Sequence, residues 1–189
     1  MAHRVIDLHC DSVSSLMEGK DLRGPVPNVH VDVSRLKAGG VGLQVFAAYV
    51  PAETAGGEAY RYANERLDAI DAFAKSDEWL APVETAAELR TIMAGGKTGI
   101  MAAVENGLAI ESSLEKLEAF RRRKVRIMTL VHSRHLDWVA SCTGTGPFLP
   151  PDGGKGQNSG LSSFGGQVVD AMNDLGIIID LSHAAESAF

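Results

Sequence analysis

The sequence predicts an α/β protein with a parallel sheet. Apolar runs that suit strands alternate with segments whose apolar residues recur at helical spacing. No hairpin signal joins neighbouring runs, and Val41–Tyr49 is apolar nearly throughout, as is typical of strands covered on both faces. Polar residues able to do chemistry directly follow the runs, namely His9, Asp11, Glu105, His132 and His183. A closed (β/α)8 barrel and an open doubly wound sheet both bind ligands at that edge.

The first part of the chain predicts two strands. Val5–Leu8 is the first, and an irregular excursion follows over Ser12–Val29, where a Gly-Pro-Val-Pro run disfavours regular structure. A short helix over Arg35–Ala38 is stopped by two glycines. The strand Val41–Tyr49 comes next and ends before Pro51.

The middle of the chain predicts two helices and two strands. Apolar residues at helical spacing predict a helix over Glu58–Lys75, and Trp79–Val83 is expected as a short extra strand. Thr85 and the glutamate three residues later form a capping box that starts a helix ending at Met93. Gly99–Val104 is the next buried strand, and it delivers Glu105.

The last part of the chain predicts two more helix–strand units. Ser112 and Glu115 are spaced as a capping box for a helix that reaches about Arg123. The remaining expected elements are the strand Val125–Val131, a long Gly- and Pro-rich loop over Thr143–Gly160, a helix from Ser162 or Ser163 to Leu175, and the strand Ile177–Leu181. Long loops without structure of their own are often functional.

Composition indicates one globular domain over residues 1–189. The chain is 45% hydrophobic and 22% charged, with a net charge of −6. The basic run Arg121–Lys124 ends a predicted helix and complements its dipole, so nucleic acid is not an expected partner. A nucleotide-binding glycine loop is absent from the sequence, which disfavours the doubly wound nucleotide-binding class.

The sequence also predicts a cytoplasmic protein. The first residues lack the apolar core of a signal peptide, and no apolar run has the length of a membrane span. The two cysteines, Cys10 and Cys142, do not form a disulfide framework, which favours a reducing compartment.

The pattern Asp7-Leu8-His9-Cys10-Asp11 is the first candidate metal site. Side chains alternate across a strand, so Asp7, His9 and Asp11 are expected on one side and Cys10 on the other, as a core thiol. An imidazole and a carboxylate so close together are ligands that zinc accepts. A strand end with polar residues facing water remains the alternative.

Four stretches of the sequence together resemble the N-terminal part of the membrane (renal) dipeptidase family. These stretches are Ile6–Asp11, His30–Gln44, Val104–Gly107 with Arg126–His132, and Gly160–Gly165 with Met172–His183. The resemblance implies a zinc-dependent hydrolase with a (β/α)8 TIM-barrel fold. This chain would supply about the first five strands of that barrel.

The resemblance also implies roles for single residues. His9 and Asp11 would hold one zinc, Glu105 would bridge two zincs, and His183 would be a ligand of the second. His132 matches the family's substrate-contacting histidine. The implied reaction is hydrolysis of small dipeptides by a metal-activated water, with His132 helping to stabilise the oxyanion.

The chain departs from the family pattern in several places. The family's later strands carry a second histidine for the second zinc and an arginine for the substrate carboxylate, and this sequence has no match to them. Asn106 stands where glycine is frequent. A homo-oligomer or a complementing C-terminal half is therefore the expected partner. A related amidohydrolase acting on lactam or N-acyl bonds, and a truncated, inactive fragment of the family, remain the alternatives.

Overall fold

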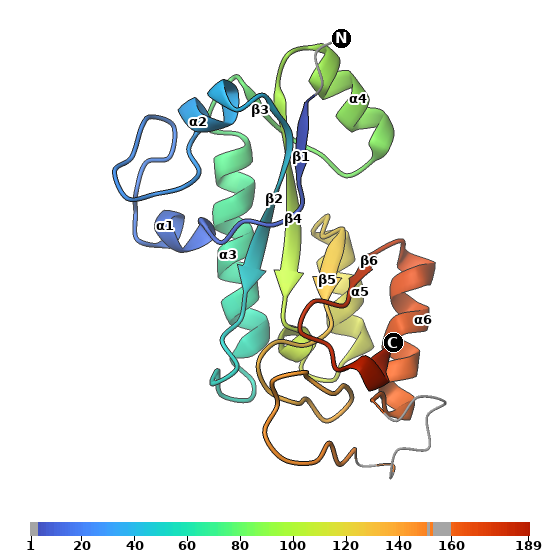
Figure 1. Ribbon diagram of the computed structural model, residues 1–189. Helices are drawn as coiled ribbons and strands as arrows, with labels where there is room; N and C mark the ends of the chain where they lie inside the picture. The colour runs from blue at the N-terminus through green and yellow to red at the C-terminus, as the bar shows by residue number, and fades with distance from the viewer. Residues whose placement is uncertain (1–3, 151, 153–159) are drawn as a thin grey trace. The chain divides into compact units, whose positions relative to one another are not determined.

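A computed structural model describes residues 4–150, 152 and 160–189 (Figure 1). Part of the predicted long loop, residues 151 and 153–159, lies outside this set. The chain divides into two compact units. The first contains residues up to Ala48 and Asn64–Ala103, and the second contains Tyr49–Ala63 and Val104–Phe189.

The first unit is a set of parallel strands with helices between them. Its strands are β1 (Val5–Asp7), β2 (Val41–Tyr49, whose last residue belongs to the second unit), β3 (Leu80–Pro82) and most of β4 (Thr98–Glu105). Its helices are α1 (Val13–Met17), α2 (Val33–Ala38), the larger part of α3 (Ala59–Ala74) and α4 (Ala86–Ala94). β1 pairs with β2 and β3 pairs with β4, both in parallel.

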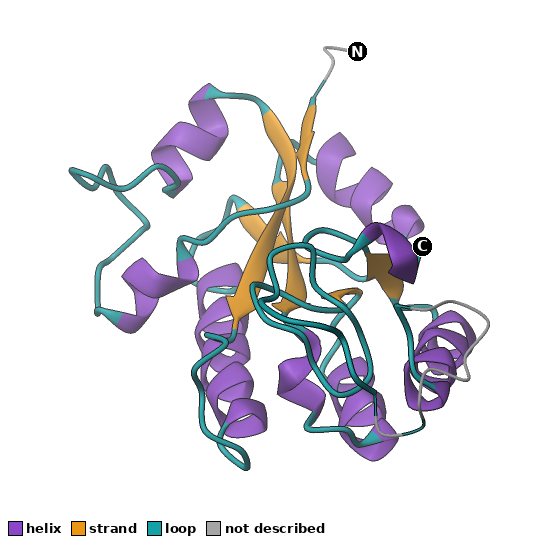
Figure 2. Cartoon of the chain, turned by 60° about the horizontal axis from the view of Figure 1, so that its bottom comes forward, coloured by secondary structure: helices purple, strands orange, loops and turns teal. Residues whose placement is uncertain are grey.

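The second unit repeats the strand–helix alternation. After the end of β4 it contains the 3-10 helix η1 (Gly107–Ile110), α5 (Leu114–Arg122), β5 (Ile127–Thr129), α6 (Ser163–Leu175), β6 (Ile178–Asp180) and the 3-10 helix η2 (Glu186–Ala188). β5 and β6 are parallel, with Thr129 opposite Asp180. Figure 2 shows strands, in orange, alternating with helices, in purple, along the chain.

Each unit has its own apolar core. In the first unit Phe46 of β2 is fully buried, and its ring lies 5.3 Å from that of Phe73 on α3. In the second unit Leu117 and Phe120 of α5 and Met172 of α6 are fully buried. The apolar stripes predicted at helical spacing therefore face the core.

Most predicted elements are confirmed, and three details are corrected. The excursion after the first strand contains the short helix α1. Ser113 caps α5, because Ser112 has φ 54°, outside the extended conformation of an N-cap, whereas Ser113 accepts a hydrogen bond from Lys116 N. The strand expected over Val125–Val131 shortens to β5, because the N–H of Val125 closes the end of α5 by bonding Phe120 O.

Helix length and apolarity also bear on membrane insertion. Within the described part of the chain, none of the helices combines the length and apolarity needed to cross a bilayer.

Candidate metal and substrate site

Three residues predicted for the site come together in the second unit. Glu105 ends β4, His132 follows β5 and His183 follows β6. Nε2 of His132 lies 3.5 Å from Glu105 Oε1, and Nε2 of His183 lies 3.7 Å from the same oxygen. The two imidazole rings lie 4.1 Å apart, centroid to centroid. The residues at or just after the ends of parallel strands in this unit thus lie together, as the sequence pattern predicted.

This cluster fits a divalent metal ion. The carboxylate and the two histidines each offer one ligand atom, and these atoms lie within 4.8 Å of one another. Two imidazole nitrogens and a carboxylate oxygen form the donor set of many catalytic zinc sites. The side chain of Glu105 is only 7% exposed. A buried carboxylate is costly unless positive charge or hydrogen bonds compensate it, which distinguishes Glu105 from a solvated acidic residue.

The turn after β4 fixes Glu105. The main-chain oxygen of Glu105 accepts a hydrogen bond from Val50 N at 3.0 Å. Asn106 has φ 86° and ψ 108°, a conformation that favours glycine. The Asn106 side chain compensates by donating to Val50 O at 2.9 Å and accepting from Leu108 N at 3.2 Å. These bonds explain how asparagine occupies a position where glycine was expected.

His132 and His183 are positioned differently. The ring of His132 packs 4.8 Å from the ring of Tyr49, and its side chain is 21% exposed. His183 has φ 67°, in the left-handed region, and its side chain is 37% exposed. A non-glycine residue in that region carries strain, and such residues cluster at functional sites.

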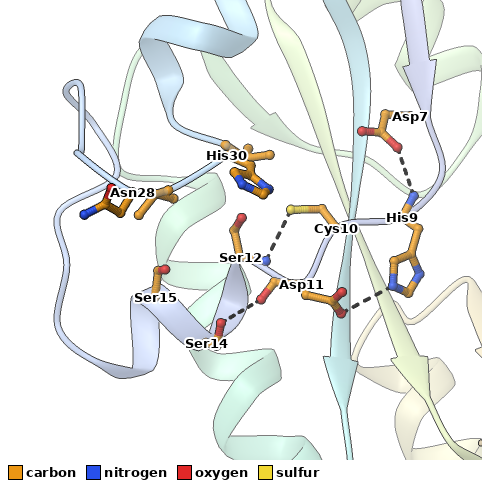
Figure 3. Close-up of a pocket in the computed structure, with 11 residues that line it drawn as sticks. Asp7, His9, Cys10, Asp11, Ser12, Ser14, Ser15, Asn28 and His30 are labelled. Atoms are coloured by element: carbon orange, nitrogen blue, oxygen red, sulfur yellow. Dashed lines mark hydrogen bonds and ion pairs between the residues drawn. The ribbon is translucent and has the colours of Figure 1, made fainter.

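The other predicted ligands, His9 and Asp11, lie in the first unit. Figure 3 shows the two side chains meeting, with His9 Nε2 3.3 Å from Asp11 Oδ1. Asp7 Oδ1 accepts a hydrogen bond from the main-chain N–H of His9 at 3.2 Å. The prediction that all three alternate along one strand is wrong, since β1 ends at Asp7 and the other two lie in the loop that follows. The loop nevertheless presents an imidazole and a carboxylate together.

Cys10 is a core thiol, as predicted. Its thiol points away from His9 and Asp11 in Figure 3, and Ser12 N donates to its Sγ at 3.3 Å. Burial raises the pKa of the Cys10 thiol, which therefore stays neutral and is a poor metal ligand. The wall of the surrounding pocket of about 430 Å³ includes His30, which is exposed.

Two further residues of the second unit, Asp180 and Trp138, have structural partners. Asp180 accepts a hydrogen bond from Thr129 Oγ1 on the neighbouring strand β5 at 2.6 Å. It accepts another from the N–H of Ser182, just after β6, at 2.9 Å. Trp138 is 2% exposed and packs against the backbone of Gly107. These contacts stabilise the strand ends and loops that carry His132 and His183.

Sequence reasoning missed Ser141. Its side-chain oxygen donates to the main-chain oxygen of His132 at 2.5 Å, and the residue is buried. Its position nine residues after His132, inside a loop, carries no periodic or motif signal that would have identified it.

Comparisons with known proteins identify curated dipeptidases as relatives of this chain. Dipeptidase 3 of Mus musculus is 34% identical over 156 residues, covering 82% of this chain and 30% of that protein. Dipeptidase tcpJ of Claviceps purpurea is 30% identical over 178 residues, covering 89% of this chain and 39% of that protein. The chain therefore spans well under half the length of these curated relatives.

Solved structures match the fold over the whole chain. A dipeptidase of peptidase family M19 superimposes with a TM-score of 0.82 and 25% identity, covering 100% of this chain and 59% of that one. A metallopeptidase from Rhodobacter sphaeroides, liganded with a phosphinate mimic of the dipeptide L-Ala-D-Ala, gives a TM-score of 0.81 at 23% identity and is covered to 61%. The parallel strands are thus part of a TIM-barrel-type fold, as predicted.

The sequence profile of one family matches residues 1–189, and it is the profile of the family that the four stretches resemble. The chain belongs to the membrane dipeptidase family, peptidase family M19.

Proposed function

We propose that this chain carries the N-terminal portion of a zinc-dependent dipeptidase site. The observation that carries the proposal is the buried carboxylate of Glu105, which has the proposed ligand His183 3.7 Å away and the proposed substrate contact His132 3.5 Å away, both measured from Nε2 to Oε1. Zinc suits imidazole and carboxylate donors together. Family membership supports a dipeptide as the substrate, because the relatives named above are dipeptidases.

The proposed ligands follow the family resemblance. His9 and Asp11 serve one zinc, His183 serves a second, and Glu105 is the carboxylate shared by both. Bound zinc would supply Lewis acidity and would make a water molecule acidic enough to act near neutral pH. The protein's own contribution is to hold these donors in fixed orientations, as Asp7 does by accepting the main-chain N–H of His9.

His132 is the proposed substrate contact. Its imidazole N–H can donate to the carbonyl oxygen of the scissile peptide, and the bond strengthens as negative charge develops there. Tyr49 packs on the His132 ring and limits its rotation. An imidazole that donates from a fixed direction needs no rearrangement during the reaction.

Metal content and hydrolysis test this proposal together. Zinc per chain is measured by elemental analysis after dialysis, and release of free amino acids from Ala-D-Ala is followed in wild type, Glu105→Gln and His132→Ala. We expect Glu105→Gln to lose zinc and activity, and His132→Ala to keep zinc but lose activity. Hydrolysis of an N-acyl amino acid without hydrolysis of dipeptides would instead identify a related amidohydrolase. A wild-type chain without zinc and without activity would identify an inactive fragment.

We also propose that further barrel strands cover exposed apolar side chains in each unit. In the first unit Ile6 is 44% exposed and Leu8 is 62% exposed, and in the second unit Ile178 on β6 is 58% exposed. Burying one large apolar side chain is worth roughly 1.5–3 kcal/mol. A complementing C-terminal half or a second copy of the chain could supply that cover. Light scattering after size-exclusion chromatography, with and without the complementing half, measures which one does.

We propose that the protein is located in the cytoplasm. Cys10 and Cys142 are both free thiols, and Cys142 is exposed. An exposed thiol suits a reducing compartment. Cell fractionation of the native protein tests the assignment.

A further inference from the structure

We propose that Ser141 is a positioning residue that sets the place of His132, while its neighbour Cys142 sets the place of His183. The proposal rests on the proposed function only for its catalytic consequence, because the geometry itself consists of hydrogen bonds within the chain. Residues 140–142 are consecutive residues of the loop after β5, and we call them the histidine brace.

The first arm of the histidine brace is a side-chain hydrogen bond. Ser141 Oγ donates to His132 O at 2.5 Å, and Ser141 is 3% exposed. The bond is part-buried, so removing its donor would leave the carbonyl of His132 with less access to water as a replacement partner. The main chain of His132 is thereby tied to a residue nine positions further along the chain.

The second arm is a main-chain hydrogen bond. Cys142 N donates to His183 O at 2.9 Å, and Ala185 N donates to Ala140 O at 3.0 Å, so the brace pairs with the residues after β6 as a short antiparallel bridge. His183 has φ 67°, and a strained conformation persists only where surrounding contacts impose it. The bond from Cys142 supplies such a contact.

The brace is itself held in place by His135. Ser141 N donates to His135 Nδ1 at 3.0 Å, which leaves the proton on Nε2, where it can donate to Gly146 O at 3.1 Å. An added Cβ at Gly144 would lie 2.5 Å from the His135 ring, so glycine is needed for this close packing. His135, which lies in the same loop, thus orients Ser141.

The two arms therefore hold two histidines through separate hydrogen bonds. Because Ser141 and Cys142 are adjacent, their spacing fixes the distance between the main chains of His132 and His183, whose rings lie 4.1 Å apart. Loss of the Ser141 hydroxyl removes the first arm and leaves the second intact. Residues that orient site groups typically change metal affinity or activity by about 10–100-fold when they are removed.

The test compares Ser141→Ala with Ser141→Thr, which keeps the hydroxyl, and with the control Thr143→Val. Thr143 Oγ1 lies 3.3 Å from Ser141 Oγ, so the control deletes a neighbouring hydroxyl without touching the bond to His132. Imidazole ¹H–¹⁵N NMR signals of the metal-free full chain are assigned with His132→Asn and His183→Asn. Thermal melting is measured in parallel.

We expect Ser141→Ala to shift the His132 signals and leave the His183 signals in place, whereas Ser141→Thr and Thr143→Val leave both in place. In zinc-loaded enzyme we expect kcat/KM of Ser141→Ala to fall at least tenfold with zinc content unchanged. A shifted His132 signal in a protein without hydrolytic activity would support the brace and count against the proposed function. Unchanged signals for both histidines with only a lower melting temperature would overturn the proposal. If Ser141→Ala does not fold, Ser141→Cys, a weaker donor, replaces it under the same criteria.

Discussion

Replacing Gly107 with alanine should destabilise the second unit and disturb the framework of His132. An added Cβ at Gly107 would lie 2.3 Å from Leu130 O and 2.6 Å from Trp138 Cζ2. The first distance is about 1.1 Å shorter than the 3.4 Å at which ordinary contact begins. Leu130 is fully buried and its N–H bonds Asp180 O, so its carbonyl has little room to move.

The size of the effect follows from this overlap. Forcing extra atoms into a packed core costs about 1–3 kcal/mol. A chain of this length loses about 2–4 °C in melting temperature per kcal/mol, so Gly107→Ala should melt roughly 2–12 °C below wild type. Thermal unfolding followed by circular dichroism measures the shift.

Gly166→Ala is the matched control for this prediction. Gly166 lies within α6, and an added Cβ there would meet no atom within 4 Å. Alanine at such a helical position should stabilise the protein by about 0.4–1 kcal/mol. A Gly107→Ala protein that melts at or above the wild-type temperature would refute the reasoning from close packing.

Three further predictions concern metal, backbone strain and pH. At zinc concentrations about 100-fold above Kd, zinc binding should stabilise wild type by about 2.7 kcal/mol. In a zinc-dependent thermal shift assay Glu105→Gln should lose this stabilisation, whereas the surface control Glu118→Gln should keep it. Asn106→Ala should cost about 1–3 kcal/mol in urea unfolding and Asn106→Gly less, because only glycine tolerates φ 86° without the side-chain bonds; equal losses would contradict this. Burial raises the pKa of Glu111, but hydrogen bonds from Lys116 and from the first turn of α3 lower it by more, so the pKa lies below its usual 4.5 in the folded protein. Its stabilising effect is present above pH 4.5 and fades as the pH falls through the lowered pKa, so the urea midpoint of wild type should drop further than that of Glu111→Gln on acidification.

The sequence predicted the fold where local patterns dominate. The strand β2 has the predicted bounds, because nine consecutive residues suited to a covered strand leave few other choices. Thr85 and Glu88 form the predicted capping box, with both hydrogen bonds present. Ser113 was missed as a cap, because the positive φ of Ser112 depends on the preceding 3-10 turn.

The candidate site was also predictable from the sequence only in part. The meeting of Glu105 with His132 and His183 could be predicted, since each follows a parallel strand. The bond between Ser141 and His132 could not, because it depends on the path of an irregular loop. The left-handed backbone of His183 could not be predicted either, since histidine has no intrinsic preference for positive φ.

The pairing of the loop after β5 with the residues after β6 also sets an order on folding during synthesis. Gly160 N bonds Ser187 O, and Ala140 O and Cys142 N bond Ala185 and His183. A ribosome makes Ala140, Cys142 and Gly160 well before residues 183–187, so these three residues must wait for their partners while β5 and α5 can already pack. His132 therefore acquires its final surroundings only when translation has passed His183. A chain stalled before that point would still contain Ser141 and His132 but would lack the bond from Cys142 to His183.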